Sequence, residues 1–327
     1  MFKTILLIYL FSFSLFAGHE WQLPKAALSK AHVNKLIGKI ETEKFDKKIN
    51  LLWVYGYDLP HKNGEHDYVY VKDTFVGLLN SVENVHADEA YGFPSKEQFA
   101  KADVLVIFTH LPDLNDEQFS DFENFVKRGG GVVTLHESVI IRPSSQGKKL
   151  SPCLGCAWNE GTSNWGAIYE PVTVNNKHKI FKGFPKKLTL NDEFYWDLYQ
   201  EEATEVLATV RIGPPQRSKG PIEDDSQLSK ERHSVFWTYT HGEGRVFGTT
   251  TGHHTFTYFD PEFRIILFRG IAWALNEDAG PFMPLVFEGI TDKNGKVGTT
   301  DNMRHLNKKE FQRIDKEKRA AMALREK

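Results

Sequence analysis

The chain has 327 residues, of which 40% are hydrophobic and 26% are charged, and its formal net charge is −2. This composition is typical of a globular protein with a large core, and it excludes a disordered or fibrous chain. The near-neutral charge argues against a nucleic-acid partner, because such proteins need an excess of Lys and Arg to displace counterions from phosphates.

The chain begins with a segment typical of a secretory signal. Lys3 precedes an apolar run from Ile5 to Phe16, which stops at Ala17. The run is shorter than the roughly 20 residues that a membrane-spanning helix needs. We therefore expect a signal peptide over residues 1–17 and an exported mature protein, periplasmic or extracellular, without a transmembrane span. An uncleaved anchor is the alternative, because Leu15 is bulkier than the small residue usual at the third position before a cut.

An N-terminal extension over residues 18–48 precedes the main domain. Between Pro24 and Phe45 its apolar residues recur at helical spacing: Val33, Leu36, Ile37 and Ile40. This pattern predicts a short amphipathic helix on the outside of the domain.

Residues 49–278 then alternate between strands and helices. Continuous apolar runs predict strands at Ile49–Tyr55, Val104–Thr109 and Val132–Leu135, and a helical stripe extends from Val71 to Val82. Asn115, with Gln118 three residues later, opens a further helix that ends at the glycines 129–131. Strands that are apolar throughout need helices on both faces. The pattern predicts a single α/β domain with a doubly wound, mainly parallel sheet, in which ligands bind outside the carboxyl ends of the strands.

The segment from Arg142 to Gln200 interrupts this alternation with Gly, Pro, Trp and Asn, apart from one strand predicted at Ile168–Val174. A connection of this length predicts a wall or a lid-like insertion over the strand ends.

The two cysteines of the chain, Cys153 and Cys156, lie in this segment. In an exported protein a short-loop disulfide between them is favoured over half of a zinc site, because no second pair completes four ligands. A redox role is weaker, since Pro152 and Gly155 indicate a loop rather than the start of a helix.

Regular structure returns with strands at Val235–Tyr239 and Arg245–Thr250, which a hairpin-like turn at residues 242–244 joins. Asp260 then caps a helix whose first turn contains Pro261. Residues 279–327 form a connector and a charged C-terminal helix from Asn307 to Lys327. A solvated surface helix is preferred for that last segment, and a docking segment is the alternative.

Ionisable side chains follow four of the predicted strands: Asp58, His110, His136 with Glu137, and His253 with His254. One histidine at a strand end is more often a polar cap than a catalyst, whereas four such sets at one edge of a sheet predict a functional site. His66 and Asp67 lie just before the first helix of the domain. Asp192 and Glu193 precede three aromatic residues, which suits a sugar ligand; a buried aromatic core with surface acids is the alternative.

These residue types limit the chemistry. Ser138 is a weak nucleophile candidate, because it lacks the flanking glycines of a nucleophile elbow, and neither cysteine follows a strand. Imidazoles and carboxylates fit either general acid–base catalysis or a divalent metal with an open position. The candidate metal ligands are His136, His253 and Asp67, with Glu137 beside them. No spacing in the sequence decides between a metal and proton transfer.

Several blocks together resemble the ThuA-like family, over roughly residues 49–276. They are Glu65–Asp67, Leu114–Phe119, Phe125–His136, His178–Ile180, Asp192-Glu193 with Tyr195, Gly242–Phe247, Gly252-His253, Phe263-Arg264 and Gly270–Trp273.

The resemblance implies a class I glutamine amidotransferase-like, flavodoxin-like fold in which the nucleophilic Cys is absent and His136 lies near its place. It also implies a carbohydrate-processing enzyme, a lyase, hydrolase or isomerase acting on keto-sugar or disaccharide-derived substrates, and not a glutamine amidotransferase. A non-catalytic carbohydrate-binding module of the same fold is the alternative, and an oligomer stays open. Carried over, the catalytic candidates are His136, His253, Glu193 and Asp67, and the substrate-binding candidates are His66, Asp192, Tyr195, Arg264, Glu137 and His254.

Overall fold

The computed structural model describes residues 24–57, 61, 64–213 and 225–298. The predicted signal peptide, Asp58 and the predicted C-terminal helix lie outside the described residues. Among the residues that are described, no helix has the length and apolar character needed to cross a membrane.

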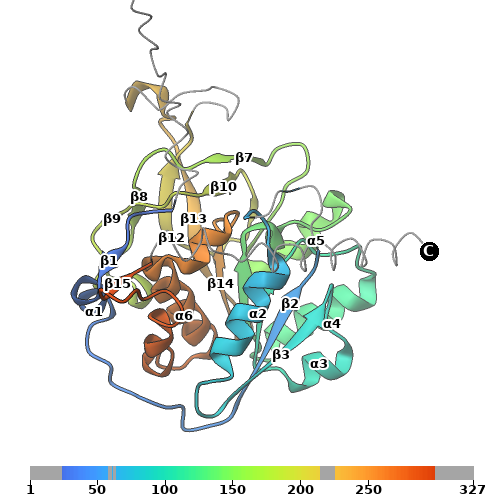
Figure 1. Cartoon of the computed structure of the whole chain (residues 1–327). Helices are drawn as coiled ribbons and strands as arrows, with labels where there is room; N and C mark the ends of the chain where they lie inside the picture. The colour runs from blue at the N-terminus through green and yellow to red at the C-terminus, as the bar shows by residue number, and fades with distance from the viewer. Residues whose placement is uncertain (1–23, 58–60, 62–63, 214–224, 299–327) are drawn as a thin grey trace, which may run out of the picture.

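A nine-stranded mixed sheet forms the centre of the protein, in the order β3-β2-β4-β5-β14-β13-β12-β8-β9 (Figure 1). Taken in that order, the strands are Val85–Tyr91, Ile49–Tyr55, Val104–Phe108, Gly131–Leu135, Gly244–Thr249, Arg232–His241, Glu205–Arg211, Val172–Val174 and Lys187–Leu188. Neighbours from β3 to β14 are parallel, and neighbours from β14 to β9 are antiparallel. The predicted α/β class is therefore confirmed, whereas the parallel pairing extends over only one half of the sheet.

Helices pack against the sheet through two separate apolar clusters. One contains side chains of α1 (Lys30–Ile37), α2 (Tyr68–Leu79) and α6 (Pro261–Leu275). The other contains side chains of α3 (Lys96–Lys101), α4 (Asp116–Lys127) and α5 (Gly147–Leu154). The strands contribute to both clusters, which is why β4 is buried at every position.

Short elements complete the fold. Three two-stranded sheets pair β1 with β15, β6 with β11 and β7 with β10, and β7 and β10 lie at the top of the view in Figure 1. These strands are Leu28–Ser29, Lys296–Val297, Cys156–Ala157, Tyr199–Gln200, Asn164–Ala167 and Glu193–Trp196. The 3-10 helices η2 to η7 are His136–Val139, Ser144–Gln146, Lys179–Phe181, Asp225–Gln227, Thr255–Phe259 and Gly280–Val286.

The predicted helix starts are present. Asn115 accepts a hydrogen bond from the backbone of Gln118, whose side chain returns to the Asn115 backbone. Asp260 likewise accepts from the backbone of Glu262 at the start of α6. Such caps satisfy the backbone N–H groups that the first helical turn leaves without partners, so they locate the start of a helix in the sequence.

The segment over residues 142–200 contains more regular structure than the sequence predicts. Residues around Pro152 form the helix α5 instead of a loop, and β7 pairs with β10 to form a wall above the strand ends. Both thiols are free and buried: Cys153 lies in α5 and Cys156 in β6, and the predicted disulfide between them is not formed. Burial raises the pKa of both thiols, so they act as small apolar core residues. Whether the segment moves as a lid stays a prediction.

Candidate active site

A cavity of about 480 Å³ opens where β5 and β14 end, a size suited to a small-molecule ligand. Its charged and polar lining includes Glu65, His66, Glu137, Glu193, His253 and His254. Its aromatic lining consists of Trp158, Trp165 and Tyr195, all from the segment over residues 142–200. The predicted site at the strand ends therefore corresponds to a real concavity.

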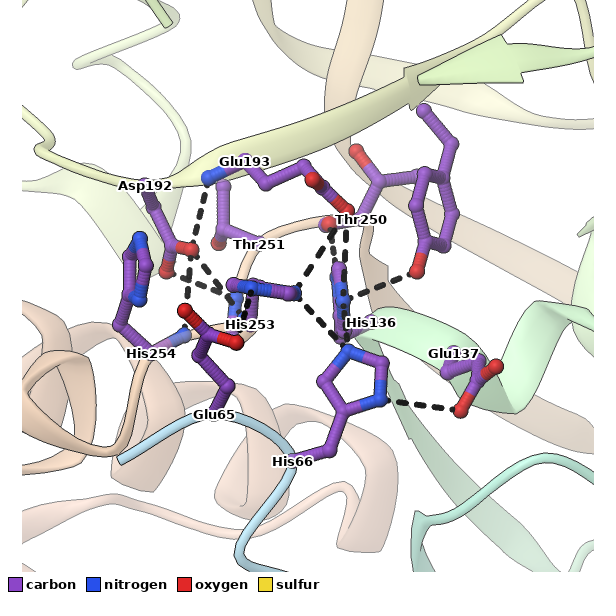
Figure 2. Close-up of polar contacts among 12 residues, drawn as sticks. Glu65, His66, His136, Glu137, Asp192, Glu193, Thr250, Thr251, His253 and His254 are labelled. Atoms are coloured by element: carbon purple, nitrogen blue, oxygen red, sulfur yellow. Dashed lines mark hydrogen bonds and ion pairs between the residues drawn. The ribbon is translucent and has the colours of Figure 1, made fainter. Parts of the chain in front are cut away.

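Three imidazole rings from distant parts of the chain meet at the base of this cavity, and we call them the histidine cluster: His66, His136 and His253. The Nε2 atom of His66 lies 2.9 Å from Nε2 of His136 and 2.9 Å from Nδ1 of His253. Figure 2 shows these rings turned toward one another. His136 is fully buried, and the other two are nearly so.

Two members of the histidine cluster have a strained backbone. The φ angle is 50° at His66 and 51° at His136. This left-handed region costs a residue with a side chain about 1–3 kcal/mol, and such residues concentrate at functional sites. His136 lies where β5 turns into η2, the kind of sharp turn at which other folds expose a nucleophile, and here it holds an imidazole.

Hydrogen bonds from outside the cluster fix two of its rings. Nδ1 of His136 lies 2.8 Å from the carbonyl oxygen of Thr250, and since a carbonyl only accepts, Nδ1 carries the proton. Nδ1 of His66 lies 3.2 Å from Oε2 of Glu137, an oxygen that also accepts from the hydroxyl of Tyr68. These contacts direct the Nε2 atoms of both rings into the cluster.

Glu137 is a buried carboxylate with several partners. Burial alone would raise the pKa of Glu137, but the hydrogen bonds from His110 and His66 outweigh it and hold this pKa well below its usual range. The guanidinium of Arg142 lies 3.6 Å from its other oxygen. Glu137 therefore remains ionised and accepts hydrogen bonds from the imidazoles beside it.

Asp192 holds the loop that carries His253, and we call residues 250–255 the His253 loop. The carboxylate of Asp192 is fully buried and accepts from the backbone N–H groups of Gly252, His253, His254 and Glu193 and from the hydroxyl of Thr257. Figure 2 shows Asp192 beside this loop, on the side away from His66. Asp192 thus positions His253 and does not line the cavity.

Glu193 faces the histidine cluster from β10. Its Oε1 atom lies 3.6 Å from Nδ1 of His253 and 3.8 Å from Nε2 of His136. Burial, with a smaller effect of the charges on Asp192 and Glu137, raises the pKa of Glu193 to about 8. Burial also lowers the pKa of His136 and His253, so that both rings are neutral at pH 7.

Aromatic side chains form one wall of the cavity. The hydroxyl of Tyr195 lies 2.9 Å from Nε2 of His136, and its ring packs at right angles to Trp158 with 5.5 Å between the centroids. Trp165 has 46% of its surface exposed although it lines the cavity. Flat aromatic faces and polar groups in one cavity suit a ligand that has both an apolar face and hydroxyl groups.

Two predicted site residues serve other purposes. Asp67 accepts hydrogen bonds from the backbone N–H of Gly64, at 2.7 Å, and from the hydroxyl of Thr255, at 2.6 Å, and does not line the cavity. Arg264 is fully buried in α6, where its guanidinium donates to backbone carbonyl groups of residues 258, 285 and 288. The structure therefore does not bring Arg264 to the cavity as an anchor for substrate.

The sequence analysis did not single out several residues of the site. Tyr68 and Thr250 orient the cluster, and Trp158 and Trp165 line the cavity. The sequence could have identified the two tryptophans, since they lie in the irregular segment that was predicted to cover the strand ends. No sequence feature could have identified the carbonyl group of Thr250, because every residue has a backbone carbonyl.

Comparison with known proteins gives three further findings. The family model ThuA, described as trehalose utilisation, matches residues 61–274. The fold is similar to a structure from Bacteroides uniformis described as ThuA-like, with 17% identity, a TM-score of 0.54, and coverage of 75% of this chain and 100% of that one. A second such structure, from Parabacteroides merdae, has 16% identity, a TM-score of 0.51, and coverage of 71% and 92%. At these identities the likeness shows the fold alone, and no curated protein matches the chain.

Proposed function

The chain belongs to the ThuA (trehalose utilisation) family, which indicates a carbohydrate-related role, and we propose that it is an exported carbohydrate-processing enzyme. The proposed reaction is that of a lyase, hydrolase or isomerase on a keto-sugar or a disaccharide-derived substrate. Export is supported by the apolar segment that follows Lys3 near the start of the chain.

The observation that carries the proposal is the position of Glu193. Its carboxyl group lines the cavity and lies within 4 Å of two neutral imidazoles, His136 and His253. A carboxylate and imidazoles around one small volume can remove a proton from a substrate carbon and return one to a substrate oxygen. No cysteine lines the described part of the cavity, so covalent thiol chemistry has no support there.

A ketone on the sugar makes this chemistry feasible for ordinary side chains. The carbonyl acidifies the C–H bond beside it, so a carboxylate can take that proton. The electron pair forms an enolate and then expels the oxygen substituent on the next carbon, and the departing oxygen gains a proton. In this scheme the ionised form of Glu193 is the base, and its pKa of about 8 makes it a stronger base than an ordinary carboxylate. The hydroxyl of Tyr195, which lines the same cavity 2.9 Å from Nε2 of His136, can donate to the leaving oxygen.

The aromatic wall supports a sugar as the ligand. Trp165 offers an exposed ring in the cavity lining, and Glu65 and Glu137 in the same lining supply acceptors for hydroxyl groups. Stacking of the apolar face of a pyranose on an aromatic ring orients the sugar and leaves its hydroxyl groups available for hydrogen bonds.

The test is turnover of a panel of 3-keto-glycosides and the parent glycosides by the purified chain. Glu193→Gln keeps the size of the side chain and removes the base, so we expect its kcat to fall by about 100-fold or more. His86→Ala, on the exposed face of β3, is the matched control and should keep full activity. Binding of a sugar with no product after long incubation would instead identify a binding module, and full activity of Glu193→Gln would remove Glu193 as the base.

A further inference from the structure

We propose that the histidine cluster is a mononuclear site for a divalent transition metal. His66 and His136 bind through Nε2, His253 binds through Nδ1, and an open coordination position faces the cavity beside Glu193. The proposal concerns metal binding alone and does not depend on the identity of the substrate.

The first argument is the placement of protons on two of the rings. Nδ1 of His136 donates to the carbonyl of Thr250, so in the neutral ring Nε2 holds a lone pair. The single hydroxyl proton of Tyr68 goes to Glu137, so Nδ1 of His66 donates either to the Glu137 carboxylate or to the Tyr68 oxygen, each 3.2 Å away. In the neutral ring this leaves a lone pair on Nε2 of His66 as well. These two lone pairs face each other across 2.9 Å. Nε2 of His136 can accept from the hydroxyl of Tyr195, and Nε2 of His66 can accept from Nδ1 of His253, each at 2.9 Å. A metal ion between the rings would bind both lone pairs at once and remove their mutual repulsion.

The second argument is the spacing of the donor atoms. Metals such as Zn²⁺ bind imidazole nitrogen at about 2.0–2.1 Å, which places neighbouring donor nitrogens about 3.3–3.4 Å apart in tetrahedral sites and about 2.8–3.0 Å apart in octahedral sites. Two of the spacings in the cluster are 2.9 Å. Two overlapping groups also have one ligand atom from each residue within 4.8 Å of the others: His136 with Glu193 and His253, and His61 with His66 and His253. Nε2 of His66 therefore lies close to the donor spacing of a shared metal ion from both other rings.

The third argument is the environment of the ligands. A histidine that binds a metal almost always donates its other ring N–H to a carboxylate or a backbone carbonyl, which fixes the ring and its tautomer. His66 has the carboxylate of Glu137 in that place, and His136 has the carbonyl of Thr250. His66 and His136 both have a left-handed backbone conformation, which costs free energy. A fold retains such a conformation where it is needed to orient the side chain.

The donor set also selects the metal class. Imidazole nitrogens favour Zn²⁺, Co²⁺, Ni²⁺ or Fe²⁺ over Mg²⁺ and Ca²⁺, which prefer oxygen. Three protein ligands with one open position are typical of catalytic sites rather than structural ones. Asp67, a candidate ligand from the sequence, is not in this shell, since its carboxylate accepts from Gly64 and Thr255.

The experiment measures metal binding by the purified chain after treatment with a chelator. We expect one equivalent of Zn²⁺ per chain by calorimetry and by elemental analysis, and a visible absorption band when Co²⁺ replaces Zn²⁺. His66→Ala, His136→Ala and His253→Ala should each weaken binding by more than about 100-fold, since loss of an outer partner alone costs about 10–100-fold. His86→Ala, an identical substitution on the exposed edge strand, should bind as the wild type does.

A second variant distinguishes weaker metal binding from misfolding. Glu137→Gln keeps the shape of the side chain that orients His66, and it should weaken Zn²⁺ binding about 10–100-fold while the circular dichroism spectrum stays unchanged. Wild-type protein that binds no stoichiometric Zn²⁺ or Co²⁺ overturns the proposal, as does equal binding by the wild type and by folded His136→Ala. Metal binding without turnover of any keto-glycoside would refute the proposed function alone, and turnover by metal-free protein would refute only a catalytic role for the metal.

Discussion

Replacing Asp192 by Asn keeps the volume of the side chain but removes one of its two acceptor oxygens. Oδ1 accepts from the N–H groups of Glu193, His253 and His254, at 2.7, 3.1 and 3.4 Å. Oδ2 accepts from the N–H of Gly252 at 2.9 Å and from the hydroxyl of Thr257 at 2.6 Å. Asn can satisfy the first group with its amide oxygen, but its NH₂ group then faces the second.

The magnitude follows from these contacts. The hydroxyl of Thr257 can rotate and accept from the new NH₂ group, whereas the N–H of Gly252 cannot. A buried N–H without an acceptor costs about 1–3 kcal/mol, and the remaining hydrogen bonds lose the charge that strengthened them, which adds about 1 kcal/mol. We therefore expect Asp192→Asn to lower the free energy of unfolding by about 2–4 kcal/mol.

Chemical denaturation of the full chain, followed by circular dichroism, measures this loss. Asp88→Asn is the matched control, because Asp88 also accepts from the N–H of the next residue, at 2.8 Å, but lies exposed on β3. Its effect should stay within about 0.5 kcal/mol. If Asp192→Asn is as mild as Asp88→Asn, the five contacts do not hold the His253 loop, and the positioning role assigned to Asp192 is wrong.

Three further predictions test other parts of the structure. Arg264→Lys should lower the free energy of unfolding by about 2–3 kcal/mol, because a lysine ammonium cannot donate to all three backbone carbonyl groups that the guanidinium contacts. An altered KM with unchanged stability would instead place Arg264 in the substrate site. Burial would raise the pKa of Glu170, but the hydrogen bonds from Arg211 outweigh it and lower this pKa. The ionised carboxylate therefore stabilises the fold at pH values above the usual carboxyl pKa of about 4.3. This stabilisation is lost as the pH falls through the lowered pKa of Glu170 in the folded protein. Glu170→Gln should therefore be less stable than the wild type at pH 7 and approach it under acid, as denaturation at several pH values would show; a constant difference would contradict the assignment. Trp165→Ala should raise the KM or Kd for a sugar by about 5–20-fold, which is equivalent to about 1–2 kcal/mol of stacking. The Tm should change little, because the ring is half exposed. Unchanged affinity would show that the sugar does not stack on Trp165.

The sequence predicted the strands and helix starts whose structure depends on residues that are close together in the chain. The apolar runs of β2, β4 and β5 are buried on both faces, and a strand with no polar face shows this pattern without tertiary information. The caps at Asn115 and Asp260 mark helix starts for the same local reason. The edge strand β3 was missed, since its segment Val85–Tyr91 is mostly polar and partly exposed. The strand β12 was missed as well, because its position in the sheet depends on pairing with β8 and β13 rather than on its own pattern.

The difference between Asp67 and the histidine cluster shows where sequence reasoning about the site ends. β5 and β14 are parallel neighbours with Leu135 opposite Thr249, so the next residues, His136 and Thr250, lie side by side at the strand ends. Knowledge of the strand order would therefore have been enough to place His136 against the loop that carries His253.

His66 reaches the same point by a different route, which no strand pattern encodes. The loop before α2 is attached to the His253 loop by backbone hydrogen bonds, from the N–H of His66 to the carbonyl of His253 at 2.9 Å and from the N–H of Thr255 to the carbonyl of Gly64 at 2.8 Å. The carboxylate of Asp67 joins the same two loops through Gly64 and Thr255. A buried carboxylate that clamps two loops and one that transfers protons look the same in a sequence, and only their hydrogen-bond partners tell them apart. In this protein the hydrogen-bond partners show that Asp67 joins the two loops, whereas Glu193 lines the cavity beside the histidine cluster and is available for chemistry.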